Sequence, residues 1–181
     1  MSIRVILRER ERERRIEQLP HTLLGKRTPR VIYLTRDVFD EFMGPWADRA
    51  WAIQMGMLRA DLDRFLENGR IIVGHRRSRH AYMKRLDPGR DEVWEIRSRD
   101  PDPEIRMFGR FAETDVFVGT ACLDRDYLGD ENSRQWRDEM VRCITDWRNL
   151  FHPYQPLRRR PLHEYVSTNV ISHRFIVGRS P

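Results

Sequence analysis

The sequence lacks any long hydrophobic run and has only two cysteines. No apolar stretch in its 181 residues approaches the ~20 residues that a membrane-spanning helix needs. Arg and Glu soon follow Met1, whereas a secretory signal would place apolar residues there. Cys122 and Cys143 are too few for a disulfide framework, and each falls in an apolar pattern. We therefore expect a cytoplasmic protein with no membrane partner.

The spacings typical of metal sites are missing as well. The six histidines are scattered, and no C-x-x-C or H-x-x-x-H arrangement occurs. The sequence therefore predicts no metal site and no other cofactor. Lysine is scarce too, because 32 of the 34 cationic residues are arginine. This bias is consistent with phosphate recognition by bidentate guanidinium groups, and a codon bias toward arginine explains it equally well.

Large apolar side chains, by contrast, are abundant. The chain has five Trp, eight Phe and five Tyr, and 39% of its residues are hydrophobic. Burial of such groups can offset the entropy lost on ordering the chain, so we expect a folded protein. Trp51, Trp94, Trp136 and Trp147 fall on apolar stripes, which favours core positions over a platform for stacking bases.

The excess positive charge lies in the N-terminal part of the sequence. Residues 1–36 hold ten basic and four acidic residues, so the net charge of +6 falls in this segment and the remainder is neutral. A second basic block without an acid spans residues 70–86 and contains Arg70, Arg76, Arg77, Arg79, Lys84 and Arg85. Two basic segments thus flank a region with a helical pattern.

Hydrophobic periodicity predicts both helices and strands. Strands are predicted at residues 30–35, 92–99, 105–111 and 115–122, and helices at residues 38–43, 46–66 and 133–151. We expect residues 1–29 to be a basic arm, because Arg and Glu alternate there with few apolar positions. Residues 30–151 then form an α+β domain, and residues 152–181 an extension that the pattern does not place.

The Pro-rich turn at residues 100–103 joins two of these strands into a hairpin. Alternation puts Trp94 and Ile96 on the core side, and on the other side it puts Glu95, Arg97, Arg99, Arg106 and Arg110. We expect helices to cover only the core side. The clustered guanidinium groups would repel one another without an anion, which favours binding of a phosphate backbone. A solvated sheet face with cross-strand ion pairs is the alternative interpretation.

Three segments of this region carry a resemblance. They read Met83-Lys84-Arg85-Leu86, Val93-Trp94-Glu95-Ile96-Arg97 and Ile105-Arg106-Met107-Phe108-Gly109-Arg110-Phe111. Together they resemble the RelE/HigB-type toxin superfamily. The resemblance implies an α+β fold with N-terminal helices on a small antiparallel sheet, to which this chain adds a further C-terminal helix and an extension. It also implies a toxin-like or phage-derived endoribonuclease that cuts mRNA without a metal, with the ribosome and an antitoxin protein as partners.

The resemblance assigns roles to the candidate site residues. Arg97, Arg106 and Arg110 would hold the phosphate, because arginine stabilises negative charge and cannot act as a base. Glu95 is a candidate counter-ion, and the candidates for proton transfer are Glu95, His80, Tyr82 and Tyr127. The predicted contacts to nucleic acid are Arg76, Arg77, Arg79, Lys84, Arg85, Arg99 and Arg125. Asp124 and Asp126 lie beside Tyr127 and would repel RNA, which departs from the family pattern.

Two other functions stay open at this point. The same arginine face and the N-terminal arm could bind RNA or DNA without cutting it. Alternatively, the arginines could meet an acidic partner protein. A steep salt dependence of RNA binding without cleavage would favour the first of these.

Overall fold

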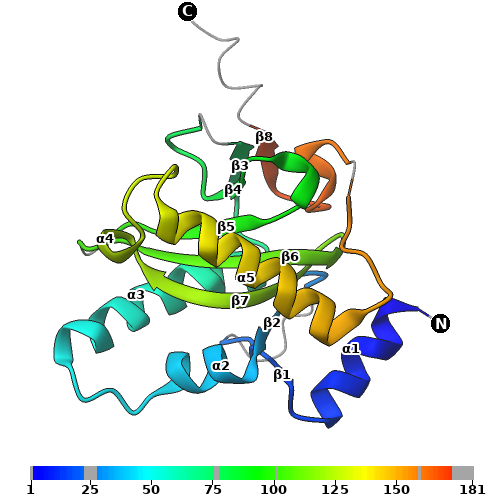
Figure 1. The fold of residues 1–181 in the computed structure, drawn as a ribbon, viewed down its shortest axis with the longest axis horizontal. Helices are drawn as coiled ribbons and strands as arrows, with labels where there is room; N and C mark the ends of the chain where they lie inside the picture. The colour runs from blue at the N-terminus through cyan, green and yellow to red at the C-terminus, as the bar shows by residue number, and fades with distance from the viewer. Residues whose placement is uncertain (1, 23–27, 76–77, 101, 159, 173–181) are drawn as a thin grey trace, which may run out of the picture.

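The computed structural model describes residues 2–22, 28–75, 78–100, 102–158 and 160–172. Within these ranges the centre of the fold is an eight-stranded sheet with the strand order β1-β2-β7-β6-β5-β4-β3-β8 (Figure 1). The strands are β1 (Ile16–Gln18), β2 (Val31–Thr35), β3 (Ile71–His75), β4 (Met83–Arg85), β5 (Trp94–Ser98), β6 (Ile105–Glu113), β7 (Val116–Asp124) and β8 (Val170–Ser172). The sheet is mixed, because antiparallel and parallel pairs both occur in it.

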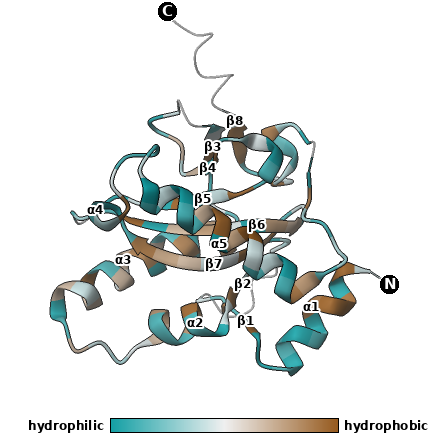
Figure 2. Ribbon diagram, in the orientation of Figure 1, coloured by the Kyte–Doolittle hydropathy of each residue, from teal (hydrophilic) through white to brown (hydrophobic). Residues whose placement is uncertain are grey.

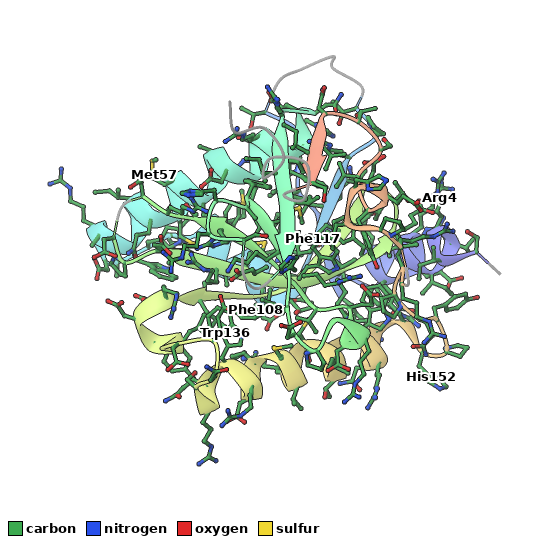
Figure 3. The ribbon with its side chains drawn as sticks, turned by 90° about the horizontal axis from the view of Figure 1, so that it is seen from above. Arg4, Met57, Phe108, Phe117, Trp136 and His152 are labelled. Atoms are coloured by element: carbon green, nitrogen blue, oxygen red, sulfur yellow. The ribbon has the colours of Figure 1, made fainter. Side chains whose placement is uncertain are left out.

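The helices lie on both sides of this sheet. They are α1 (Ile3–Arg12), α2 (Arg36–Met43), α3 (Arg49–Leu66), α4 (Arg125–Leu128) and α5 (Arg134–Phe151). The two long helices begin at capped residues: Asp48 accepts hydrogen bonds from two backbone amides of α3, and Ser133 accepts one from Trp136 of α5. Seen from above, α5 and α3 lie on opposite sides of the sheet (Figure 3).

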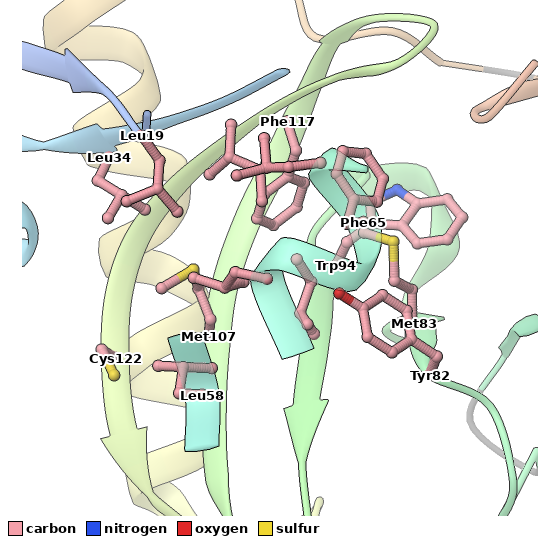
Figure 4. Close-up of a cluster of buried hydrophobic side chains, with 14 of the residues drawn as sticks. Leu19, Leu34, Leu58, Phe65, Tyr82, Met83, Trp94, Met107, Phe117 and Cys122 are labelled. Carbon is pink, nitrogen blue, oxygen red and sulfur yellow. The ribbon is translucent and has the colours of Figure 1, made fainter. Parts of the chain in front are cut away.

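Each side of the sheet has its own hydrophobic core. On one side α2 and α3 pack on Trp94, Ile96 and Met107 and on residues from the neighbouring strands (Figure 4). On the other side α5 packs along its whole length, near α4 through Trp136 and near α1 through Trp147. The hydrophobic positions accordingly concentrate in the strands and on the inner faces of the helices (Figure 2).

The antiparallel part of the sheet agrees with the sequence pattern. Strands β5, β6 and β7 pair in the predicted order, and β5 and β6 form the predicted hairpin. The strand predicted at residues 30–35 and the helices predicted at residues 38–43, 46–66 and 133–151 are confirmed to within three residues at each end.

The predicted fold class is wrong in its central element. We expected helices on a small antiparallel sheet of the RelE type, whereas the sheet found in the described residues has eight strands and three parallel pairs. The parallel pairs join β2 to β7, β3 to β4 and β3 to β8. The fold remains α+β, but β1, β3 and β8 come from short segments that show no alternating pattern in the sequence.

The segment predicted as a basic arm forms α1 and β1. Ile6 and Leu7 of α1 are buried against the side of the sheet that α5 covers, and β1 pairs with β2. The expectation of an arm outside the core is therefore corrected for these residues. The C-terminal segment also enters the core, since Tyr165 and Val166 are fully buried and β8 pairs with β3. Within the described ranges, no helix is long and apolar enough to cross a membrane.

Candidate functional site

The hairpin has the predicted alternation of faces. Arg97 on β5 lies opposite Arg106 on β6, and Glu95 lies opposite Phe108, so these side chains share one face of the sheet. That face is not open, however. The exposed fraction is 1% for Glu95, 2% for Arg106 and 6% for Arg110. The expectation of an uncovered arginine face is corrected, because α5 packs on this face through Trp136 and Met140.

The buried charges on this face form an ionic network around Glu95. Its Oε2 atom lies 3.2 Å from Arg106 Nε, and its Oε1 atom lies 3.6 Å from Lys84 Nζ and 3.7 Å from Arg97 Nε. Lys84 also contacts Glu131 at 2.9 Å, and Arg106 contacts Glu104. The cross-strand register of β4, β5 and β6 brings Lys84, Glu95, Arg97 and Arg106 side by side. Glu104 lies directly before β6, and Glu131 lies between α4 and α5.

Burial controls the electrostatics of the network. Desolvation raises the pKa of Glu95, and the charges of Arg106, Lys84 and Arg97 oppose this rise. Burial alone would also raise the pKa of Glu104, but the hydrogen bond and charge of Arg106 outweigh it and hold that pKa below its usual range. The side chains of Arg106, Lys84 and Glu95 thus neutralise one another inside the protein, where an RNA phosphate cannot reach them.

The other candidate residues of this face and its surroundings are spread over the structure. Arg110 lies beneath α5 with its guanidinium over the ring of Trp147, and Arg125 lies over the ring of Trp136. Tyr127 is 58% exposed on the short helix α4. Arg85 is partly buried and lies 3.7 Å from Glu92. Arg76 and Arg77 lie outside the described residues.

A different group of the predicted residues does converge. His80, Arg97 and Arg99 line an open pocket of about 230 Å³ at the end of β5, which we call the β5 pocket. The remaining lining residues are Met57, Asp61, Arg64, Tyr82 and Asp100. Three segments build this pocket: the C-terminal half of α3, the loop between β3 and β4, and the end of β5.

Backbone contacts fix the arginines of the β5 pocket. Arg97 Nη1 donates to the carbonyl oxygen of Arg79 at 2.8 Å, and Arg99 Nη2 donates to the same oxygen and to that of Ala81. Arg64 Nε donates to the carbonyl oxygen of Arg70 at 3.0 Å. The loop between β3 and β4 thus lies directly beside the end of β5, and its carbonyl groups hold the guanidinium groups of Arg97 and Arg99 in place.

The β5 pocket contains more cationic than anionic groups. Arg64, Arg97 and Arg99 face Asp61 and Asp100, and the imidazole of His80 adds positive charge when it is protonated. Burial raises the pKa of Asp61, and a hydrogen bond from Ser98 and the charge of Arg64 oppose this rise. Burial lowers the pKa of Arg97, which still stays protonated as arginine does in proteins. The arrangement can attract and orient an anion.

Sequence reasoning missed the contribution of α3 to this pocket. Asp61 and Arg64 lie on the polar side of an amphipathic helix, and only its apolar stripe carried a signal. Tyr82, a candidate for proton transfer, also lines this pocket, but its side chain is buried and its hydroxyl donates to the carbonyl oxygen of Asp61 at 2.6 Å. In the described part of the chain, no three His, Cys, Asp or Glu side chains are grouped to hold a metal ion.

Comparisons with known proteins found nothing similar. No protein family, no curated protein and no solved structure matches this chain. The resemblance to the RelE/HigB-type toxin superfamily accordingly stays a prediction from three short segments.

Proposed function

We propose that the protein binds the phosphate backbone of RNA at the β5 pocket. The observation that supports this most directly is the convergence of Arg64, Arg97 and Arg99, from two separate elements, on one open pocket. Arginine is suited to this task because its guanidinium group donates paired hydrogen bonds to phosphate oxygens.

The surroundings of the pocket extend this basic surface. Arg70 and Arg79 are exposed, and their backbone carbonyls accept the hydrogen bonds from Arg64, Arg97 and Arg99. Two exposed arginines therefore lie next to the pocket, Arg70 directly before β3 and Arg79 in the loop between β3 and β4. A chain of regularly spaced phosphates fits such a surface better than a single small anion does.

Binding has more support than cleavage. Cleavage by attack of the 2′-hydroxyl needs a proton acceptor, a proton donor and charge stabilisation at one phosphate. Of the predicted catalytic residues, Arg97 and His80 line the β5 pocket, whereas Glu95 and Arg106 are held in the buried network and Tyr127 lies on α4. The endoribonuclease activity and the ribosome and antitoxin partners stay predictions.

The test is RNA binding measured by fluorescence anisotropy at several salt concentrations. We expect Arg64→Gln and Arg99→Gln to weaken binding of a single-stranded RNA. Each should also reduce the slope of log K against log salt by ~0.7, because each removes one phosphate contact. The matched control is Arg134→Gln, since Arg134 is 87% exposed on the first turn of α5 and forms only a local ion pair. Equal losses in all three variants would disprove a specific role for the β5 pocket.

The same preparations decide between binding and cleavage. RNA incubated with the wild-type protein and then separated on a denaturing gel should stay intact. If it is cut, and if His80→Gln abolishes the cut while keeping the affinity for RNA, the β5 pocket is catalytic and the proposal of a noncatalytic module is wrong.

A further inference from the structure

A second pocket lies beneath the C-terminal end of α5, and we call it the Arg110 pocket. It has a volume of about 220 Å³. Its lining residues are Arg90, Asp91, Arg110, Ile144, Trp147, Arg148, His152, Tyr154 and Gln155. None of these residues lines the β5 pocket. The two pockets also lie toward opposite ends of the hairpin, since Arg106 pairs with Arg97 near one end and Gly109 pairs with Trp94 near the other.

Arg110 has an unusual environment for a charged side chain. It is 6% exposed, and its guanidinium carbon lies 5.5 Å from the centre of the Trp147 ring. Its Nη2 atom donates to the carbonyl oxygen of Asp91, while its Nε atom is buried without an acceptor. Unlike Arg106, it forms no ion pair with any carboxylate in the described ranges of the chain. Burial lowers the pKa of Arg110 even though the charges of Asp91 and Glu92 oppose this. A buried cation with no close ion pair is unfavourable unless a further anion joins it.

The rest of the Arg110 pocket adds to its positive charge. Arg148 and His152 are exposed at its rim, and among the described residues Arg148 forms no ion pair. Asp91 is the single acidic residue among the described residues that line the pocket, and its carboxylate lies 3.8 Å from Arg90. Three guanidinium groups and an imidazole therefore surround one carboxylate, which favours a ligand with two negative charges.

The size and the walls of the pocket narrow the choice of ligand. Its volume equals that of about seven water molecules in the liquid and lies below the range of ~300–1,000 Å³ typical of drug-sized ligands. A volume of this size suits a phosphate group with a short carbon skeleton. Ile144 and Trp147 provide an apolar wall beside the guanidinium of Arg110. Such a wall can contact a short carbon skeleton while the cations hold an anionic group.

We propose that the Arg110 pocket binds the phosphate group of a small phosphate monoester. The guanidinium of Arg110 contacts the phosphate from within the pocket, and Arg148 and His152 contact it from the rim. This site does not depend on RNA binding at the β5 pocket, because the two sites share none of the residues that the structure describes.

The test is binding of glycerol 3-phosphate, measured by isothermal titration calorimetry and by thermal unfolding. Sodium chloride of equal ionic strength is the control for screening. We expect a stabilisation by glycerol 3-phosphate that sodium chloride does not reproduce. Arg148→Gln should weaken binding by about tenfold, since it removes a charge-assisted hydrogen bond. Arg134→Gln removes the same charge from the same helix and should leave binding unchanged.

Further variants keep the test independent of folding. Arg110→Lys retains the charge but loses the paired donors, so it should bind more weakly than the wild type. If Arg110→Lys does not fold, His152→Gln and Arg148→Gln at the exposed rim carry the test instead. Equal binding by the wild type, Arg148→Gln and His152→Gln would overturn the proposal, as would an equal effect of sodium chloride.

The terminal phosphate of an RNA presents the same chemistry as a free phosphate monoester. A 5′-phosphorylated dinucleotide and its 5′-hydroxyl counterpart distinguish the two sources. If glycerol 3-phosphate binds more tightly than either dinucleotide does, the ligand is the free small molecule. If the 5′-phosphorylated dinucleotide binds more tightly than glycerol 3-phosphate does, and if this preference is lost in Arg148→Gln, the choice is overturned in favour of an RNA end. Saturation with glycerol 3-phosphate should leave RNA binding at the β5 pocket unchanged, so either site can fail without the other.

Discussion

Replacing Arg106 by methionine should destabilise the protein strongly. Arg106 Nε is 3.2 Å from Glu95 Oε2, and both side chains are almost fully buried. Removing one partner of a buried ion pair costs about 3–5 kcal/mol, because the other charge stays buried with less compensation. In Arg106→Met, Lys84 and Arg97 remain near Glu95 only at 3.6 and 3.7 Å. For a chain of this size, the expected decrease in melting temperature is about 6–20 °C.

The pH dependence gives this prediction a second readout. Burial raises the pKa of Glu95 in the folded state, so the folded protein binds this proton more tightly than the unfolded chain does. The stability that the proton contributes is present below the unfolded pKa of about 4.3 and is lost as pH rises through the folded pKa. Arg106 opposes this rise in pKa, so in Arg106→Met the pKa of Glu95 should rise further. The stability of the variant should then decrease over a wider pH range than that of the wild type. Arg106→Met should therefore be less destabilising at pH 5 than at pH 8.

Urea unfolding followed by circular dichroism measures both effects. Arg134→Met is the control, because Arg134 is exposed and its loss should change the free energy of unfolding by less than about 0.5 kcal/mol. Adding Glu95→Gln to Arg106→Met should recover at least about 1 kcal/mol, since it removes the charge left behind. A loss below about 1 kcal/mol for Arg106→Met, or a double variant in which the losses simply add, would refute an ionic network.

Three further predictions concern packing and the buried tyrosine. Tyr165→Phe should lower the free energy of unfolding by about 1–3 kcal/mol, because the Tyr165 hydroxyl donates to Glu92 Oε2 at 2.6 Å in the core. Burial raises the pKa of Tyr165 to about 12. The protonated hydroxyl of Tyr165 therefore contributes stability that is fully present below the unfolded pKa of ~10 and is lost as pH rises through about 12. Unfolding measured at increasing alkaline pH should show this loss in the wild type and not in Tyr165→Phe. Gly109→Ala should cost about 1–3 kcal/mol in urea unfolding, because its Cβ would collide with the Val118 carbonyl and the Phe117 ring, and an unchanged stability would contradict this packing. Leu7→Ala should cost about 2–5 kcal/mol if α1 belongs to the core, whereas a freely moving arm would show no loss in thermal unfolding.

The sequence predicted which side chains of the hairpin share a face, but it did not predict which helix packs on each face. Trp94 and Ile96 face one core, and Glu95 and Arg97 face the other side, as period two predicts. The apolar stripe of α5 predicts that this helix packs on another element, but it does not indicate on which face of the sheet. One signal was present nonetheless: Phe108 shares the arginine face, is fully buried and packs on Trp136 with ring centres 5.3 Å apart.

The parallel pairs and most of the β5 pocket lay beyond sequence reasoning for a physical reason. Pairing of β2 with β7 joins segments about 85 residues apart, and such contacts leave no local pattern in the chain. His80, Arg97 and Arg99 were candidate residues, and the structure brings them to one pocket. Asp61 and Arg64 complete that pocket from α3, and an exposed polar helix position gives no indication of which strand end it approaches.

The two outermost strands of the sheet, β1 and β8, have a consequence for the behaviour of the protein in concentrated solution. Each spans three residues in the part of the chain that the structure describes, while the central strands β6 and β7 span nine. An unpaired strand edge is a template on which a second molecule can add its own backbone, and shortening that edge removes most of the available donors and acceptors. The long apolar strands are thus kept inside, and the borders of the sheet give little opportunity for aggregation.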